Sequence, residues 1–205
     1  MSQYFENQKE KAKKQLEEIL EDMEKFTKIL SNDYKFSRQV LKKDSANQML
    51  RRMVVRNFCA LVEGQIHQWK WMALNFFKIF EVRVEDAETA LLREETYDLD
   101  NKGHVAIKRQ NLQVGKNFKF SCEMFARVCG CSYVPDFDDN GWDCLLKVFE
   151  VRNRLMHPKQ SKGVEVNDTE VLLLQRAHDW FLKVRLGLFG SIDLNKVLRN
   201  CRSNN

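Results

Sequence analysis

The sequence predicts a mainly α-helical protein that carries one small β-hairpin. Apolar residues recur at steps of three and four through most of the chain, which is the period of a helix with one buried face. One short stretch instead alternates apolar and polar residues, which is the period of a strand. The 205 residues include only two prolines and eight glycines, so little of the chain suits linkers, and fourteen phenylalanines and four tryptophans supply large buried surfaces. We therefore expect one globular domain with a helical appendage rather than two full cores.

The N-terminal part of the chain, residues 6–30, is typical of an amphipathic helix with a strongly charged outer surface. Its apolar positions are Ala12, Leu16, Ile19, Leu20, Met23, Phe26 and Leu30. Residues 1–44 are therefore assigned to an N-terminal amphipathic helix and a connector.

A second long helix is predicted from Met49 to Phe80. Ser45 to Gln48 has the form of a capping box, in which side chains satisfy the first backbone N–H groups of a helix. The pattern fits one long helix or two nearly collinear ones. Gly64 is its weak point, since a glycine in mid-helix costs about 1 kcal/mol relative to alanine.

A short helix is plausible over residues 85–95, and a β-hairpin follows at about 96–108. Apolar and polar residues alternate on both sides of a turn sequence that runs from Asp100 to Gly103. Because two strands alone are only marginally stable in water, we expect this hairpin to need the helices beside it.

The rest of the chain is predicted to be helical between polar loops. Helices are expected over 117–129, over 141–157, and from a cap at Asn167 to Glu170 up to about residue 188; loops at 132–140 and 158–167 separate them. The main helical domain therefore spans residues 45–190, and residues 191–205 form a short C-terminal segment.

The helix over residues 141–157 carries the most informative pattern. Asn140 to Asp143 resembles a capping box, and the helix must end at His157 because Pro158 disfavours helical geometry in the residue before it. On a helical wheel its apolar face consists of Trp142, Leu145, Val148, Phe149, Leu155 and Met156. Arg152 lies in the middle of that face, where a permanent charge is costly unless it is paired or faces a shared cleft.

Two neighbours of Arg152 complete a candidate site. Asn153 and His157 are four residues apart and stack along one edge of the helix, so the three side chains can converge on one small volume. A histidine before a proline is more often a capping or surface residue, but the misplaced arginine favours an acid/base role. Arg154 instead lies on the charged face, four residues after Glu150, where an exposed ion pair is the ordinary explanation.

The sequence RNRLMH at residues 152–157 matches the Arg-polar-x-x-x-His signature of the HEPN superfamily, which lies near the end of a helix in an α-helical bundle. The residues that flank it, the upstream helix around Leu61 to Gly64 and the hairpin also resemble bacterial HEPN-like proteins of about this size. The resemblance covers most of residues 45–188 and does not clearly cover residues 1–44. It implies a HEPN-type helical bundle in which the hairpin is an insertion.

This resemblance implies a metal-independent endoribonuclease, in which the RNA 2′-hydroxyl attacks the adjacent phosphate to leave a cyclic phosphate and a free 5′-hydroxyl end. His157 would move protons at the attacking or leaving oxygen, Arg152 would stabilise charge on the phosphoryl oxygens, and Asn153 would orient the histidine or the phosphate. One chain offers one such histidine, whereas the reaction benefits from an acid and a base on opposite sides of the scissile bond. In HEPN proteins a homodimer supplies both, because two copies of the motif face each other in a composite cleft.

Three further residues are weaker candidates. Lys159 and Lys162, in the loop after the motif, are possible RNA-binding residues, and solvated loop lysines explain them equally well. Glu63, at the edge of the apolar face of the second long helix, ranks lower as a residue that supports the catalytic ones. No metal ion or cofactor is expected.

Two other classes of function remain open. HEPN domains also serve as non-catalytic nucleotide-binding, protein-binding or scaffold modules, although the complete Arg152, Asn153 and His157 set favours the ribonuclease. The other alternative is a purely structural helical protein. Under every alternative, we interpret the aromatic pairs Trp69/Trp71 and Phe76/Phe77 as core residues.

The resemblance also suggests a biological setting, namely a toxin or a phage-defence effector that an antitoxin or another regulatory protein controls. In superfamily toxins that a nucleotidyltransferase antitoxin controls, a tyrosine stands two residues after the histidine. Here that position is Lys159, so control by modification of that tyrosine is excluded.

Composition adds weaker expectations. The net charge of +5 fits a polyanionic partner or simply a solvated lysine-rich surface. The six cysteines are irregularly spaced and expected to be reduced, and Cys129 and Cys131 are too close for the usual zinc-ligand spacing. No apolar run approaches the roughly 18 residues that span a bilayer, and the N-terminus is charged where a signal peptide is apolar. We therefore expect a cytoplasmic protein without membrane association.

Overall fold

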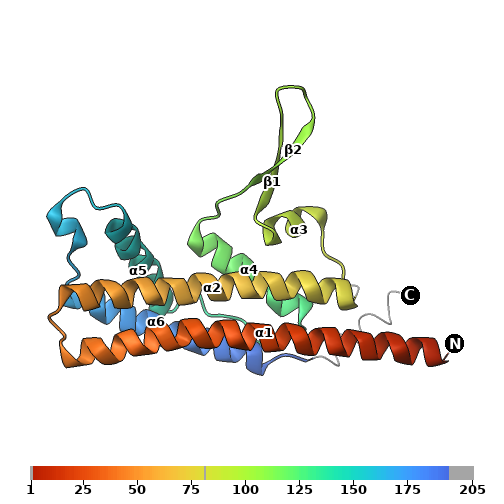
Figure 1. Ribbon diagram of the computed structural model, residues 1–205, viewed down its shortest axis with the longest axis horizontal. Helices are drawn as coiled ribbons and strands as arrows, with labels where there is room; N and C mark the ends of the chain where they lie inside the picture. The colour runs from red at the N-terminus through yellow and green to blue at the C-terminus, as the bar shows by residue number, and fades with distance from the viewer. Residues whose placement is uncertain (1, 81, 194–205) are drawn as a thin grey trace. The chain divides into compact units, whose positions relative to one another are not determined.

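The computed structural model describes residues 2–80 and 82–193 (Figure 1). These residues form six α-helices, one short 3-10 helix and one two-stranded antiparallel sheet, so the mainly α-helical fold with one small hairpin is confirmed. They divide into two compact units. Residues 2–23, 66–132 and 191–193 form the first unit, and Glu24–Gln65 and Tyr133–Gly190 form the second. Most of the C-terminal segment expected over 191–205 lies outside the described residues.

Helix α1 (Ser2–Lys43) is longer than the sequence pattern predicted, because it continues well past residue 30. The added turns keep a buried stripe at helical spacing, formed by Tyr34, Ser37 and Leu41. Ser37 interrupts the apolar pattern, but its hydroxyl donates a hydrogen bond of 2.7 Å to the carbonyl of Tyr34, which satisfies it inside the bundle.

Helix α2 (Gln48–Phe80) is a single unbroken helix. Its cap is Asn47 and not the expected Ser45: the Asn47 side-chain oxygen accepts hydrogen bonds from the N–H groups of Met49 and Leu50, at 3.0 and 3.3 Å. An aspartate or asparagine next to the helix competes well with a more distant serine for these donors.

Gly64 is where α1 approaches α2 within the second unit. A Cβ atom at this position would lie 2.4 Å from Leu30 Cδ1 and 3.0 Å from the Phe26 ring, so a larger residue would require these two side chains to shift. The glycine that weakens α2 as an isolated helix therefore allows the Leu30 and Phe26 side chains to pack closely against it.

The first unit contains α3 (Asp86–Leu92), β1 (Glu95–Leu99), β2 (Val105–Arg109) and α4 (Val114–Val128) around the second half of α2. Trp69 of α2 is fully buried and meets the rings of Phe118 and Phe125 at centroid distances of 5.4 and 6.3 Å. Trp69 and Phe76 are core residues as predicted, whereas Trp71 and Phe77 are only partly buried.

A buried lysine links three segments of this unit. Lys70 Nζ donates hydrogen bonds to a carboxylate oxygen of Glu94 at 3.1 Å and to Oδ1 of Asn117 at 2.9 Å. Glu94 has a backbone φ of 58°, in the left-handed region, and directly precedes β1. Burial lowers the pKa of Lys70, and the Glu94 carboxylate opposes that effect.

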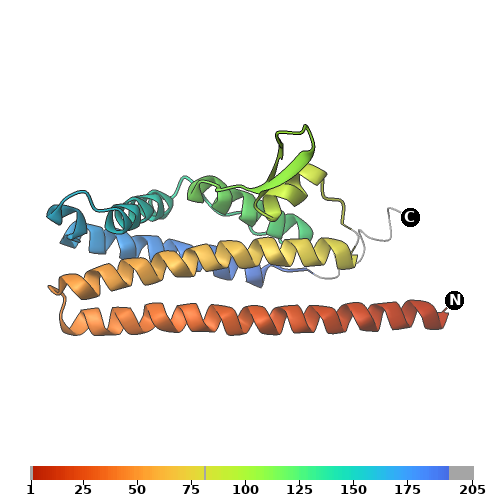
Figure 2. The same cartoon turned by 45° about the horizontal axis from the view of Figure 1, so that its top comes forward.

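The hairpin forms around the predicted turn, with Tyr97 opposite Ile107 and Leu99 opposite Val105. These four apolar side chains share one face and are 57–70% exposed. Helix α3 contacts β1 at the base of the hairpin, whereas the tip extends away from α3 in Figures 1 and 2.

The second unit contains α5 (Asn140–Met156), the 3-10 helix η1 (Ser161–Val164) and α6 (Asp168–Gly190), with the adjoining halves of α1 and α2. The cap of α5 is Asp139, one residue before the expected Asn140; its carboxylate accepts a hydrogen bond from the N–H of Gly141 at 2.6 Å. Gly141 allows close packing against Trp180, whose Cβ would lie 2.3 Å from an added Cβ. The start of α5 is thus fixed against α6.

Helix α6 begins at the predicted cap. The Asn167 side chain accepts from the N–H of Glu170 at 2.9 Å, and the Glu170 carboxylate accepts from the N–H of Asn167 at 3.0 Å. This reciprocal pair is a capping box that satisfies donors at the helix start.

No helix within the described residues is long and apolar enough to cross a membrane. The cysteines in the same part of the chain form no disulfide, and Cys59, Cys122 and Cys129 are buried. Burial raises the pKa of these three thiols well above the ordinary value, so they stay protonated and behave as small apolar side chains.

Candidate functional site

The candidate site lies at the C-terminal end of α5, in the second unit. The helix ends where the proline predicted: its last residue is Met156, and His157 is the C-cap with φ −129° and ψ 59°. The backbone N–H of His157 donates to the carbonyl of Asn153 at 3.1 Å, which keeps the two residues on consecutive turns.

Arg152 is held by side chains on two sides. Its Nη2 donates to both carboxylate oxygens of Glu63, at 2.8 and 2.9 Å, and its Nη1 donates to Oδ1 of Asn153 at 3.0 Å. The side chains of Arg152 and Glu63 are 31% and 43% exposed, so the ion pair is in contact with solvent. The charge within the apolar face of α5 is therefore paired, and Glu63 is a closer neighbour of the motif than its place on the helical wheel suggested.

Some donors of this cluster remain available. Within the described residues, Arg152 Nε and the side-chain amide N–H groups of Asn153 make no hydrogen bond, and neither does the ring of His157. Asn153 and His157 are both exposed. The structure thus joins Arg152, Asn153 and Glu63 directly and places His157 at the helix end beside them, without a bond from its ring to the other three.

Arg154 has a different role from the one predicted. It does not pair with Glu150: its Nη2 forms an ion pair with Glu170 at 2.6 Å. Its Nη1 donates to the carbonyls of Gly163 and Glu165 at 3.0 and 2.8 Å, and a longer contact of 3.4 Å reaches the carbonyl of Lys162. The expected exposed i,i+4 pair is wrong, because a guanidinium reaches backbone carbonyls and the start of α6 that a helical wheel cannot show.

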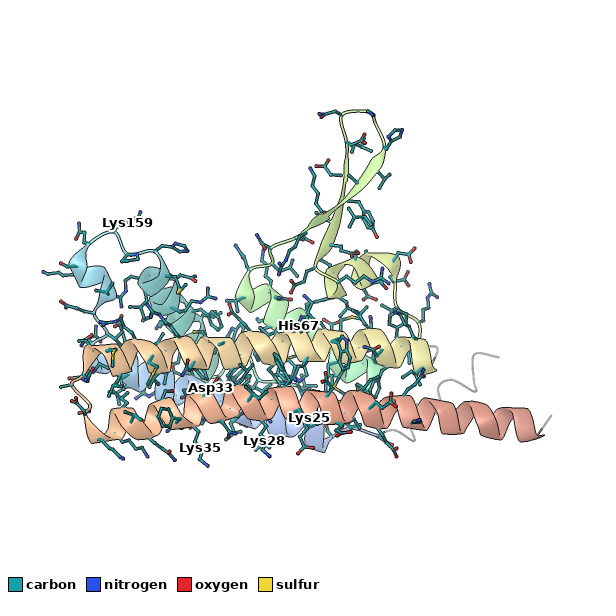
Figure 3. The ribbon with its side chains drawn as sticks, viewed as in Figure 1. Lys25, Lys28, Asp33, Lys35, His67 and Lys159 are labelled. Atoms are coloured by element: carbon teal, nitrogen blue, oxygen red, sulfur yellow. The ribbon has the colours of Figure 1, made fainter. Side chains whose placement is uncertain are left out.

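Arg154 therefore fixes the loop that follows the motif. This loop begins at His157, directly after α5, and ends at the capping box of α6. Glu170 of that capping box is the residue that pairs with Arg154. The candidate RNA-binding residues Lys159 and Lys162 are exposed on this loop, and Figure 3 shows Lys159 at its outer edge. In the part of the chain that the structure describes, their side chains form no hydrogen bond or ion pair with the motif residues.

The start of α2 holds the same loop from its other side. Gln48 exchanges two hydrogen bonds with the backbone of Val166, at 3.0 and 2.8 Å, and Arg52 donates to the carbonyl of Val164 at 3.2 Å. Figure 2 shows α5 and the first half of α2 running in roughly opposite directions within this unit. The backbone around the candidate site is thus secured from α2, α5 and α6.

A second cluster of polar residues in this unit lies between α1 and α6. His178 Nδ1 is 3.1 Å from Asp179 and 3.5 Å from Arg38, and its ring lies 5.1 Å from the ring of Tyr34. Burial lowers the pKa of His178, and Asp179 opposes this. This cluster contains a histidine, an arginine and a carboxylate but is partly enclosed by aromatic rings.

The first unit has a hollow of about 450 Å³ between α1 and α2, lined in part by Glu18, Asp22, Trp71 and Lys78. It contains none of the predicted site residues. In the part of the chain that the structure describes, no group of three or more His, Cys, Asp or Glu side chains is arranged to hold a metal ion.

Comparison with known proteins finds no match to this chain among family models, curated proteins or solved structures.

Proposed function

We propose that the chain is a metal-independent endoribonuclease of the HEPN type that acts on RNA in the cytoplasm. The observation that carries the proposal is the motif itself: Arg152, tied to Glu63 and Asn153, lies partly exposed beside a histidine at the helix end that has no hydrogen-bonding partner in the described structure. These are the residue types that a phosphodiester transesterification needs, and they face solvent.

In the proposed reaction, one His157 ring accepts the proton of the 2′-hydroxyl as its oxygen attacks the adjacent phosphorus. The bond from phosphorus to the 5′-oxygen breaks, and a second imidazolium gives that oxygen a proton, which leaves a 2′,3′-cyclic phosphate and a free 5′-hydroxyl. Arg152 donates N–H groups to the non-bridging oxygens, where charge increases in the transition state. Glu63 and Asn153 limit the positions that the guanidinium can take.

The second histidine comes from a second copy of the chain in this proposal. His157 and its neighbour Met156, which is 51% exposed, give this edge of α5 a surface that a two-fold partner can cover. Sedimentation velocity at micromolar concentration is expected to show a dimer. A strict monomer that cleaves RNA would contradict the composite site.

The proposal is tested by incubating the protein and its His157→Ala variant with mixed RNA in EDTA. We expect cleavage by the wild type and a loss of about 10²–10⁴-fold in the variant, since that is the usual contribution of a general acid or base. His67→Ala is the matched control, because His67 is an exposed histidine of α2 (Figure 3) that belongs to the first unit, whereas the motif belongs to the second. Equal behaviour of all three proteins would instead favour a non-catalytic nucleotide- or protein-binding module.

We further propose that the enzyme is a toxin or a phage-defence effector restrained by an antitoxin or another regulatory protein. Expression in bacterial cells is then expected to arrest growth, and Arg152→Ala is expected to abolish the arrest. Arrest that persists in this variant would exclude RNA cleavage as its cause.

A further inference from the structure

We propose that the first half of α2 supplies a second phosphate-binding subsite, centred on Arg56, which holds a phosphodiester next to the one that is cut. The inference rests on the proposed ribonuclease function and names residues on a different helix from the motif. Its ligand is the backbone of single-stranded RNA.

The first step is the spacing of charged residues along α2. Arg52, Arg56 and Glu63 follow one another at intervals of four and seven residues, so at about 100° per residue they lie within about 40° of one another around the helix. Arg56 lies about 10 Å along the helix axis from Glu63 and about 6 Å from Arg52. The three residues therefore form one stripe.

The second step is what this stripe faces. At one end Glu63 binds Arg152, and at the other Arg52 donates to the carbonyl of Val164 at 3.2 Å. The two contacts run in reverse order along the two chain segments, and Arg56 lies between Arg52 and Glu63 on the side of α2 that makes them. A phosphodiester next to the one at Arg152 can therefore reach Arg56 along this side of α2.

The third step is the balance of charge. Glu63 neutralises Arg152, so this pair attracts a polyanion weakly, and Arg51 and Arg154 are likewise paired with Asp168 and Glu170. Within the described residues, Arg56 is exposed and has no ion pair. It is therefore a cation on this face of α2 that is available to an incoming phosphate.

The loop reinforces this positive charge. Lys159 and Lys162 are exposed in the same part of the structure, and the segment from His157 to Val166 contains one carboxylate, Glu165. An RNA chain whose scissile phosphate reaches Arg152 would thus pass an uncompensated cation on the next part of its backbone. Such contacts fix the register of a nucleic acid and make its binding depend on salt.

The test uses a fluorescein-labelled single-stranded RNA of twelve nucleotides, bound by the His157→Ala protein so that it is not cut. Adding Arg56→Ala is expected to weaken binding roughly tenfold and to reduce the slope of log affinity against log salt by about one. Arg56→Lys, which keeps the charge, is expected to retain most of the affinity, and Arg56→Glu to lose more than the alanine variant.

Lys35→Ala is the matched control, because Lys35 is an exposed cation on α1 that points away from the loop bearing Lys159 in Figure 3. It is expected to bind within about twofold of the parent. Thermal unfolding followed by circular dichroism confirms that each variant is folded, as expected for exposed positions. Binding by the Arg56→Ala protein equal to that of the Lys35→Ala protein overturns the subsite.

The failures of the two proposals are distinguishable by adding cleavage assays with His157 intact. If the wild type cuts RNA and Arg56→Ala raises KM about tenfold with kcat unchanged, both stand. If the wild type cuts and Arg56→Ala matches Lys35→Ala, the subsite alone is wrong. If the wild type binds RNA through Arg56 but does not cut it, the subsite stands and the ribonuclease does not.

Discussion

Arg152 and Arg154 are two residues apart in α5 and nearly equally exposed, at 31% and 35%, yet their surroundings differ in kind. Arg154 binds backbone carbonyls of the loop and the glutamate that caps α6, so its partners belong to the framework. Among the described residues, Arg152 binds the side chains of Glu63 and Asn153, which are themselves exposed and can rearrange when an anion arrives. Exposure does not separate a structural arginine from a candidate site arginine here, whereas the nature of the partners does.

The largest effect that this comparison predicts is on activity. Arg152→Ala is expected to lower kcat/KM for RNA about a hundredfold or more, because it removes donors to the phosphoryl oxygens, while the free energy of unfolding changes by less than about 1 kcal/mol. Urea unfolding and cleavage kinetics measure both quantities. A large loss of stability together with the loss of activity would mean that Arg152 is structural too.

Arg154→Ala is expected to lower the free energy of unfolding by about 2 kcal/mol, since it leaves loop carbonyls and Glu170 without their partner. Glu150→Ala is the control, because it removes the i,i+4 neighbour that the helical wheel would pair with Arg154; it should change stability by less than about 0.5 kcal/mol. Equal effects of the two substitutions in urea unfolding would restore the simpler exposed pair.

Glu63→Gln sharpens the account of Arg152. The amide keeps a hydrogen bond to the guanidinium but removes the charge that neutralises it, so RNA binding is expected to tighten severalfold at low salt. At the same time kcat is expected to fall, because the guanidinium is less tightly positioned. Fluorescence anisotropy with labelled RNA measures the first effect, and an unchanged affinity would show that Glu63 does not govern the charge at this site.

The smallest expected effect concerns the cluster around His178. Its pKa in the folded protein is lowered by burial, so between that lowered pKa and pH 6.5 the unfolded chain binds more protons, and the free energy of unfolding decreases as the pH falls across this range. His178→Gln is expected to flatten this part of the stability curve and to leave RNA cleavage unchanged. A loss of cleavage would move the site to the second cluster of histidine, arginine and carboxylate.

The sequence predicts most of the helices because their apolar periodicity is local information, and it predicts the hairpin and the cap of α6 from residues close in the chain. The N-cap residues of α2 and α5 differ from the predicted ones because neighbouring Asn and Asp side chains compete for the same N–H groups. Which side chain accepts the hydrogen bond depends on local geometry that the sequence does not show. The end of α1 was missed because Ser37 reads as polar until its internal hydrogen bond is seen.

The sequence predicts the residues of the candidate motif but not the residues that hold them in place. Arg152, Asn153 and His157 lie within six residues, so helical spacing alone brings them together. Glu63 and Glu170 reach their arginines across 89 and 16 residues, and no local rule joins them. The sequence thus indicates the candidate catalytic residues, and only the tertiary structure shows which side chains bind and position them.

The most direct test of the difference between the two arginines compares Arg152→Lys with Arg154→Lys in cleavage of labelled RNA in EDTA, at a temperature where both variants are folded. Each substitution keeps the charge and removes the planar fork of donors. We predict that Arg152→Lys loses about a hundredfold or more in kcat/KM, whereas Arg154→Lys stays within about threefold of the wild type. Equal losses in the two variants would contradict the assignment of the site to the Arg152 side of α5.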